Sequence, residues 1–190
     1  MPEPHAGGPF VRYDFLAPLE LMKTLQALDR LASSWAPSRE MRLLGRGGTT
    51  QVRGADMAVQ AQLEVVRAIL APAALQWAKV CGFWFPRPPQ LQLFPVRMLG
   101  DRDDPAYQEP HVDSVETQPD PPICANVFYA RARAIEGGEL VVAARSGEDL
   151  SDAVIVRPAA NTLVSFAGDR VHTVKPLYAG ERLSVVINFY

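Results

Sequence analysis

Apolar residues recur every three or four positions in the early part of the chain, which is the spacing of amphipathic helices. One helix is predicted over Leu16–Trp35, after which Pro37 discourages continuation. Its apolar positions are Leu16, Leu19, Met22, Leu25, Leu28 and Leu31. A second helix is predicted over Asp56–Lys79, with Asp56 as a candidate N-cap and Pro72 dividing it in two.

The pattern changes after Cys81, where prolines disfavour a helix and short apolar runs alternate with turn residues. The predicted strands are Leu91–Leu99, Tyr107–Val115, Ile123–Ala130, Glu139–Ala144, Ala153–Arg157, Thr162–Phe166, Val171–Pro176 and Leu183–Tyr190. Short strands without helical periodicity between them predict an antiparallel sandwich, barrel or jelly roll. We therefore expect a mainly β, α+β fold in which helical support over about residues 10–80 braces a core over about residues 90–190.

Composition fits one globular domain and removes several classes of function. The 190 residues are 48% hydrophobic and 21% charged, and a formal charge of -2 lacks the basic footprint of a dedicated nucleic-acid binder. No uninterrupted apolar stretch has the ~18 to 20 residues of a membrane span, and residues 1–10 lack the basic start of a secretion signal. We expect a cytoplasmic protein in which Cys81 and Cys124 are small buried side chains. The pattern leaves the oligomeric state open.

Two of the three histidines fall in predicted strands and lie near an aspartate. His111 and Asp113 are two residues apart, so on a strand they project from one face and can chelate a cation. His172 follows 59 residues after Asp113, and a folded sheet could bring it to the same point. Two imidazoles and one carboxylate form the facial triad of non-haem Fe(II) oxygenases. The alternative is an exposed His-Asp pair and an unrelated core histidine.

The final predicted strand alternates strictly between two faces. One face carries Arg182, Ser184, Val186 and Asn188, and the other carries Leu183, Val185, Ile187 and Phe189. If the first face lines a barrel, Arg182 is a buried guanidinium that needs an anion, for which a bidentate carboxylate is the best partner. The alternative places Arg182 at the end of a hairpin, pointing into water after a turn at Tyr178–Glu181.

Together these motifs resemble a known family. They span roughly Leu91–Tyr190 and comprise His111-Val112-Asp113, Gly137-Gly138-Glu139-Leu140, Asn161–Phe166, His172 and Arg182-Leu183-Ser184. In this order they resemble the Fe(II)- and 2-oxoglutarate-dependent oxygenases, in particular the prolyl-hydroxylase-like branch with its double-stranded β-helix (jelly-roll) core. The resemblance implies that O2 and 2-oxoglutarate are used to hydroxylate, or otherwise oxidise, an unactivated C–H bond, with release of succinate and CO2.

The resemblance also implies roles for individual residues. His111, Asp113 and His172 would ligate Fe(II), while Arg182 would receive the distal carboxylate of 2-oxoglutarate and Ser184 would add a hydrogen bond to it.

Two further assignments follow from the resemblance. Tyr129 looks like the tyrosine of that branch that reaches the same carboxylate, although it could equally be an ordinary core aromatic. Asn188, on the face of Arg182, would lie nearer the metal and could touch substrate.

The chain departs from the branch on the strand before His111. Phe94 or Met98 occupies the position where members often carry a tyrosine, and Tyr107 could compensate and touch substrate. Asp113 is a carboxylate where the related halogenases have a small residue. The resemblance therefore favours hydroxylation, or an allied two-electron oxidation, over halogenation.

Substrate identity is not readable from the motifs. Any lid must come from residues 1–10, Met41–Gly54, Gly100–Ala106 or Ser114–Pro122, and the glycine-rich Met41–Gly54 is predicted to be a mobile loop. We expect a small-molecule, amino-acid or peptidyl substrate, and neither nucleic acid nor membrane as partner.

Two other classes stay open. One is a cupin-like metalloenzyme that uses the same triad without 2-oxoglutarate. The other is a non-catalytic jelly-roll binding module.

Overall fold

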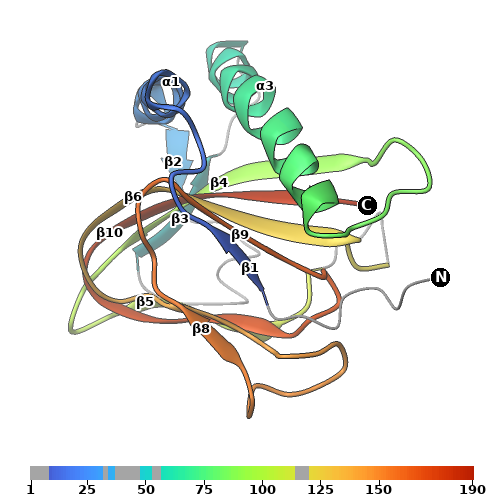
Figure 1. Cartoon of the computed structure of the whole chain (residues 1–190). Coiled ribbons are helices and arrows are strands. Elements are labelled where there is room, and N and C mark those ends of the chain that lie inside the picture. The colour runs from blue at the N-terminus through green and yellow to red at the C-terminus, as the bar shows by residue number, and fades with distance from the viewer. Residues whose placement is uncertain (1–8, 32–33, 37–47, 53–56, 114–119) are drawn as a thin grey trace.

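The structure is a computed structural model that describes residues 9–31, 34–36, 48–52, 57–113 and 120–190. Its helices within these ranges are α1 (Pro18–Arg30) and α3 (Met57–Val80). Its strands are β1 (Phe10–Arg12), β2 (Trp35–Ala36), β3 (Gly48–Val52), β4 (Leu91–Leu99), β5 (Ala106–His111), β6 (Cys124–Gly137), β7 (Leu140–Val142), β8 (Val154–Val156), β9 (Thr162–Phe166) and β10 (His172–Phe189). Both helices lie on one side of a strongly curved sheet (Figure 1).

Every strand pair in the described ranges is antiparallel, and β10 joins the two halves of the curved sheet. Its C-terminal part lies between β6 and β4 in the order β1-β9-β6-β10-β4-β3-β2. Its N-terminal part pairs instead with β5 and β7, and β7 pairs with β8. One strand therefore carries residues into both layers of the curl, as the prediction of a jelly roll requires.

Two glycines permit the tight curvature. Gly180 lies within β10 at a φ of +85°, and a Cβ there would come within 2.2 Å of the Arg133 carbonyl oxygen. Gly137 ends β6 at a φ of +83°, and a Cβ there would come within 2.0 Å of the Pro176 carbonyl oxygen. Both positions exclude other residues, because the left-handed conformation and the close approach of backbone both require the absence of a side chain.

Alternation along β6 and β10 separates two apolar cores. Phe128, Leu183 and Ile187 face the helices and pack with Leu28 of α1 and Leu70 of α3. The intervening residues face the interior of the curl, where Ala125, Val127 and Tyr129 pack with Val96, Phe166 and Leu177. The predicted faces of the final strand are confirmed, and the second face of β6 and β10 is the one that lines the candidate site.

The structure confirms both predicted helices, but the bounds and the buried face of the first helix differ from the prediction. The first helix is shorter than Leu16–Trp35, and Leu19 and Met22 are exposed. A strict three-residue spacing drifts around a helix of 3.6 residues per turn, so part of the predicted stripe leaves the buried face.

The second helix is continuous, and the predicted division at Pro72 is wrong. Pro72 lies on its exposed side, where the helix can bend slightly around the ring. The proposed N-cap Asp56 lies outside the described residues.

Helix α3 is long and apolar enough to cross a membrane by length and composition. In this structure its apolar residues Val66, Leu70, Ala74 and Ala78 are buried in the core between the helices and the sheet. Its exposed residues include the Glu64–Arg67 ion pair and also Met57, Val65 and Val80.

The structure confirms most of the strands that were predicted after Cys81. Leu91–Leu99 and Thr162–Phe166 are strands with the predicted bounds. The separate strands Val171–Pro176 and Leu183–Tyr190 are in fact one strand, β10. The turn expected at Tyr178–Glu181 is wrong, because β10 continues through these residues. Its register against β6 shifts here at bulges.

Strands in the N-terminal half were not predicted. β1 pairs with β9, and β3, which lies within the expected mobile loop Met41–Gly54, pairs with β4. The prediction of a loop is therefore wrong for Gly48–Val52, whereas residues 41–47 and 53–54 lie outside the described residues, as do residues 1–8 and 114–119 of the other proposed lids.

Candidate metal and anion sites

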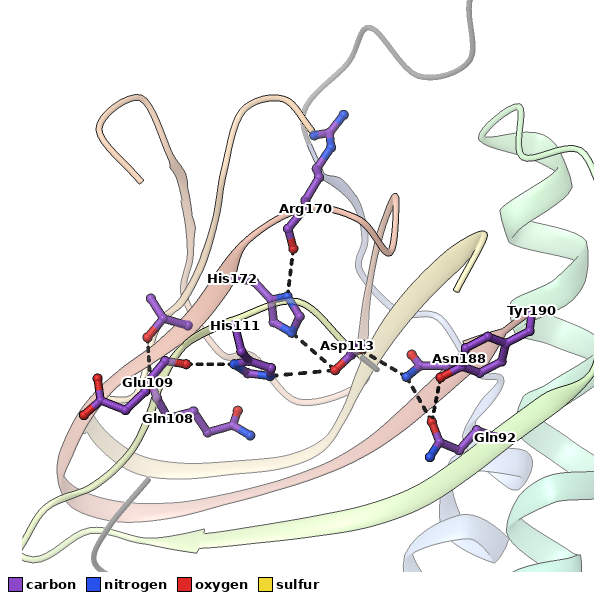
Figure 2. Close-up of polar contacts among 10 residues, drawn as sticks. Gln92, Gln108, Glu109, His111, Asp113, Arg170, His172, Asn188 and Tyr190 are labelled. Carbon is purple, nitrogen blue, oxygen red and sulfur yellow. Dashed lines mark hydrogen bonds and ion pairs between the residues drawn. The ribbon is translucent and has the colours of Figure 1, made fainter. Parts of the chain in front are cut away.

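The three predicted ligands meet inside the curl. His111 ends β5 and pairs in register with His172, the first residue of β10, so the two imidazoles lie side by side with ring centroids 4.3 Å apart. Asp113 follows β5, and its Oδ1 lies 3.7 Å from the Nε2 atom of each histidine. The three potential ligand atoms lie within 4.8 Å of one another (Figure 2). The predicted strand Tyr107–Val115 is too long, because Asp113 lies beyond the end of β5.

Backbone carbonyls orient both imidazoles. His111 Nδ1 is 2.7 Å from the carbonyl oxygen of Glu109, and His172 Nδ1 is 3.1 Å from that of Arg170. A carbonyl only accepts hydrogen bonds, so in the neutral ring Nδ1 carries the proton and Nε2 keeps its lone pair. Both lone pairs are thereby presented to the space beside Asp113 Oδ1.

Burial favours the neutral form of the second imidazole. The side chain of His172 is 7% exposed, and burial lowers its pKa below the usual value, with the Asp113 carboxylate acting in the opposite direction. Phe166 covers the ring, at 5.0 Å between centroids. A neutral imidazole is the form that binds a metal.

Two neutral imidazoles and one carboxylate on one side of a point fit a divalent transition metal. Such a donor set leaves positions open on the other side, as in the facial triad of non-haem Fe(II) oxygenases. The reading of an unrelated core histidine is wrong, since His172 lies against both His111 and Asp113.

A second polar group lies farther along β10. Arg182 is 3% exposed, and its guanidinium carbon lies 5.1 Å from the centroid of the Tyr129 ring. One of its terminal nitrogens donates to Met98 Sδ at 3.2 Å, a weak acceptor. The hairpin alternative for Arg182 is therefore wrong, because the side chain points into the core.

This group has hydrogen-bonding capacity left over. In the described part of the chain, neither Arg182 Nε nor the Tyr129 hydroxyl has a hydrogen-bond partner, although both are buried. Burial raises the pKa of Tyr129, with the Arg182 charge acting in the opposite direction, so the phenol stays protonated and can donate. Ser184 pairs in register with Tyr129, and its hydroxyl donates to the Val96 carbonyl at 3.4 Å. A buried cation with unused donors around it fits a carboxylate.

The two remaining predicted residues lie differently. Asn188 is buried, and its Nδ2 donates to Asp113 Oδ2 at 3.1 Å and to Gln92 Oε1 at 3.3 Å. Tyr107 lies on β5 and is half-buried, and among the described residues its hydroxyl has no polar contact. The structure thus brings Asn188 to the triad and leaves Tyr107 without a contact to it.

Sequence reasoning missed Gln92 and Tyr190. Gln92 pairs in register with Asn188, and its Oε1 also accepts from the Tyr190 hydroxyl at 3.1 Å. The alternation of β4 could have identified Gln92, because it shares the inner face of that strand with Phe94, Val96 and Met98. Of the two candidates for the missing tyrosine, Met98 is the residue in contact with Arg182.

Solved structures with this fold cover almost the whole chain. A Pseudomonas putida prolyl-4-hydroxylase is similar over 96% of this chain and 92% of its own, with 22% identity and a TM-score of 0.63. A Trichoplax adhaerens prolyl hydroxylase, solved with a peptide fragment of hypoxia inducible factor, is similar over 97% and 84%, with 15% identity and a TM-score of 0.70. The α-ketoglutarate-dependent epimerase SnoN from nogalamycin biosynthesis is similar over 97% and 76%, with 15% identity and a TM-score of 0.68.

Sequence comparison alone finds none of these relationships. No protein-family model matches the chain, and no curated protein matches it. The structural likeness over nearly the full length of the chain nevertheless identifies the architecture. The chain has the jelly-roll fold of the prolyl hydroxylases and other 2-oxoglutarate-Fe(II) oxygenases.

Proposed function

We propose that the protein is an Fe(II)- and 2-oxoglutarate-dependent oxygenase that hydroxylates a C–H bond of its substrate. The observation that carries this proposal is the pairing of two sites on the inner face of β10. A triad suited to a divalent metal lies at one end, and a buried arginine without a carboxylate partner among the described residues lies farther along. A keto acid with a second carboxylate is a ligand that can use both.

The chain's own residues would divide the work as follows. His111, His172 and Asp113 would hold Fe(II) through the two Nε2 atoms and Oδ1. Arg182 would pair with the distal carboxylate of 2-oxoglutarate, and the hydroxyls of Tyr129 and Ser184 would donate to the same group. All three side chains are buried, and Ser184 would exchange the Val96 carbonyl for the carboxylate.

Bound Fe(II), 2-oxoglutarate and O2 would supply the oxidation, in which one oxygen atom enters the product and the other enters succinate as CO2 is released. The protein's contribution is orientation. The carbonyls of Glu109 and Arg170 hold the imidazoles in the ligating tautomer, and the apolar wall around His172 excludes water. The carboxylate of Asp113 occupies a position that a halogenase would need for a halide, which favours hydroxylation.

We infer that the substrate is a small molecule, an amino acid or a peptidyl residue. One structure with this fold holds a peptide fragment, and another is an epimerase of a biosynthetic pathway, which supports both kinds of substrate without choosing between them. The buried Oδ1 of Asn188 has no partner in the described ranges and supports a substrate with an N–H or O–H donor near the reacting carbon. Tyr107, four residues before His111, is proposed as a second contact with the substrate.

The cytoplasm is the proposed compartment, since both cysteines are free thiols.

An anaerobic titration tests the proposal. The metal-free protein is titrated with Fe(II) and then with 2-oxoglutarate, and the visible charge-transfer band of the chelated keto acid is followed, with His172→Ala as control. We expect a band in the wild type and none in the variant. Iron binding without a band would refute the use of 2-oxoglutarate and favour a cupin-like metalloenzyme. Failure to bind iron would refute the enzyme assignment and leave a binding module.

A further inference from the structure

The two carboxylate oxygens of Asp113 lie in different environments. Oδ1 faces the Nε2 atoms of His111 and His172 at 3.7 Å each, whereas Oδ2 accepts a hydrogen bond from Asn188 Nδ2 at 3.1 Å. Asp113 lies beyond the end of β5 and is not itself part of a strand. Its side chain therefore depends on contacts with other elements for its orientation (Figure 2).

Asn188, by contrast, lies on a rigid element. It is 1% exposed and lies near the end of β10, where it pairs in register with Gln92 of β4 and Ala125 of β6. Strands on both sides of β10 thus fix the backbone from which the amide reaches the carboxylate. A group held in this way can impose its position on a residue that lies outside the sheet.

The chemistry of its neighbours determines which way the Asn188 amide points. Nδ2 faces the Asp113 carboxylate and also Gln92 Oε1, and both of these are acceptors. Gln92 Oε1 is in turn held by the hydroxyl of Tyr190 at 3.1 Å. Turning the amide over would place Oδ1 against two acceptors, so the observed orientation is the one that the network allows.

The same orientation has a cost that points to function. It leaves Asn188 Oδ1 buried and without a hydrogen-bond partner in the part of the chain that the structure describes. An unsatisfied buried acceptor is destabilising, and a leucine of similar size would avoid the penalty. What the asparagine contributes is therefore the pair of hydrogen bonds donated by Nδ2, and one of these holds a candidate metal ligand.

We infer that Asn188 is a positioning residue that holds Asp113 so that it offers a single oxygen, Oδ1, to the metal. By occupying Oδ2, the amide opposes bidentate ligation, which would consume a coordination position needed by the cosubstrate. Gln92 and Tyr190 act one step farther out, by fixing the amide of Asn188. This inference rests on the proposed function, since it concerns the same metal.

Asn188→Leu tests the inference through metal binding rather than turnover. The probes are Fe(II) under anaerobic conditions and Co(II), whose visible absorption reports the coordination geometry. Loss of a partner that orients a metal ligand lowers affinity by about 10- to 100-fold, so we expect a dissociation constant for Fe(II) higher by ~10-fold or more. We also expect an altered Co(II) spectrum. The melting temperature of the metal-free protein should change little, because removal of the orphaned Oδ1 partly offsets the loss of the two hydrogen bonds donated by Nδ2.

Asn126→Leu is the matched control. Asn126 is also fully buried, on the neighbouring strand β6, but it donates to the Ile187 carbonyl and accepts from Ser165 Oγ, away from the triad. The control should lower the melting temperature and leave the Fe(II) dissociation constant of the folded protein unchanged. If both variants weaken Fe(II) binding equally, the effect of Asn188 is structural and the inference is wrong.

Gln92→Leu gives a second route if Asn188→Leu does not fold. Because Gln92 acts through Asn188, we expect a smaller loss of Fe(II) affinity, about 3-fold, and a double variant no weaker than Asn188→Leu alone. Wild-type Fe(II) affinity in Asn188→Leu, or in Gln92→Leu where Asn188→Leu does not fold, would overturn the inference while leaving the proposed function intact. A wild-type protein that binds no Fe(II) overturns both, and is recognised before any variant is made.

Discussion

The two polar groups inside the curled sheet differ in how completely they are satisfied. In the triad, each imidazole has a carbonyl for its Nδ1, and Asp113 has the amide of Asn188 for its second oxygen. Around Arg182, by contrast, the guanidinium has a thioether as acceptor. Its Nε and the Tyr129 hydroxyl have no partner among the residues described.

This difference indicates which site is ready before its ligand arrives. Three ligand atoms already converge at the triad, so a metal adds bonds to an arrangement that exists without it. The Arg182 group instead contains a buried charge whose desolvation is not offset by a carboxylate, a state that is costly until an anion binds. We therefore expect substitutions at the triad to affect function and those around Arg182 to affect function and stability in opposite directions.

The largest effect is expected at the triad. His172→Ala removes one of the three ligands. The dissociation constant of Fe(II) should rise by more than the roughly 10- to 100-fold that follows the loss of a residue orienting a ligand. Anaerobic Fe(II) titration measures it, and the charge-transfer band with 2-oxoglutarate should vanish. A variant that retains wild-type Fe(II) affinity would show that the metal lies elsewhere.

Arg182→Leu should separate the two sites most clearly. Loss of one partner of a buried charge pair costs about 2–5 kcal/mol, so the dissociation constant of 2-oxoglutarate should rise at least ~30-fold. Fe(II) affinity should stay at the wild-type level. The melting temperature of the ligand-free protein should hold or rise, because an uncompensated buried charge is replaced by an apolar side chain. A marked fall would mean that Arg182 stabilises the fold in its own right.

The contrast also explains what the sequence could predict. His111, Asp113 and His172 were candidates because chelation needs particular side chains, and the resemblance to the oxygenase family was needed to choose the triad over an exposed pair and an unrelated core histidine. The alternation of Leu183–Tyr190 placed Arg182 on one face with Ser184 and Asn188 but left open whether that face is buried, and the resemblance to the oxygenase family favoured burial. Local periodicity and side-chain chemistry therefore identified the candidates, and the resemblance selected among the alternatives.

Features that depend on long-range pairing were not predictable in the same way. The contact between Asn188 and Asp113 requires the register of β10 between β4 and β6. Strand β1 forms because β9, about 150 residues later, supplies its hydrogen bonds, so its three residues carry little local signal. Pro72 was misjudged for a related reason, since whether a proline breaks a helix depends on which side faces the core.

Tyr129→Phe sharpens the comparison with a smaller change. Among the described residues the hydroxyl is buried without a hydrogen-bond acceptor, so its removal should leave the melting temperature nearly unchanged. A hydrogen bond to a charged group contributes about 1.5 kcal/mol or more, so 2-oxoglutarate binding should weaken by ~10-fold. Calorimetric titration into the Fe(II)- or Co(II)-loaded protein gives the value. If affinity is unchanged, Tyr129 is a core aromatic and no part of the anion site.

Ser184→Ala should have the smallest effect around the anion site. Unlike Tyr129, the Ser184 hydroxyl already has an acceptor, the Val96 carbonyl at 3.4 Å, and must give it up to reach a carboxylate. The net gain of such an exchange is small, about 0.5–1 kcal/mol, so the dissociation constant of 2-oxoglutarate should rise only ~2- to 5-fold. The same calorimetric titration measures it, with Ser165→Ala on the other face of the sheet as control. An effect as large as that of Tyr129→Phe would mean that an already satisfied donor contributes as much as an unsatisfied one, and the contrast between the two hydroxyls would fail.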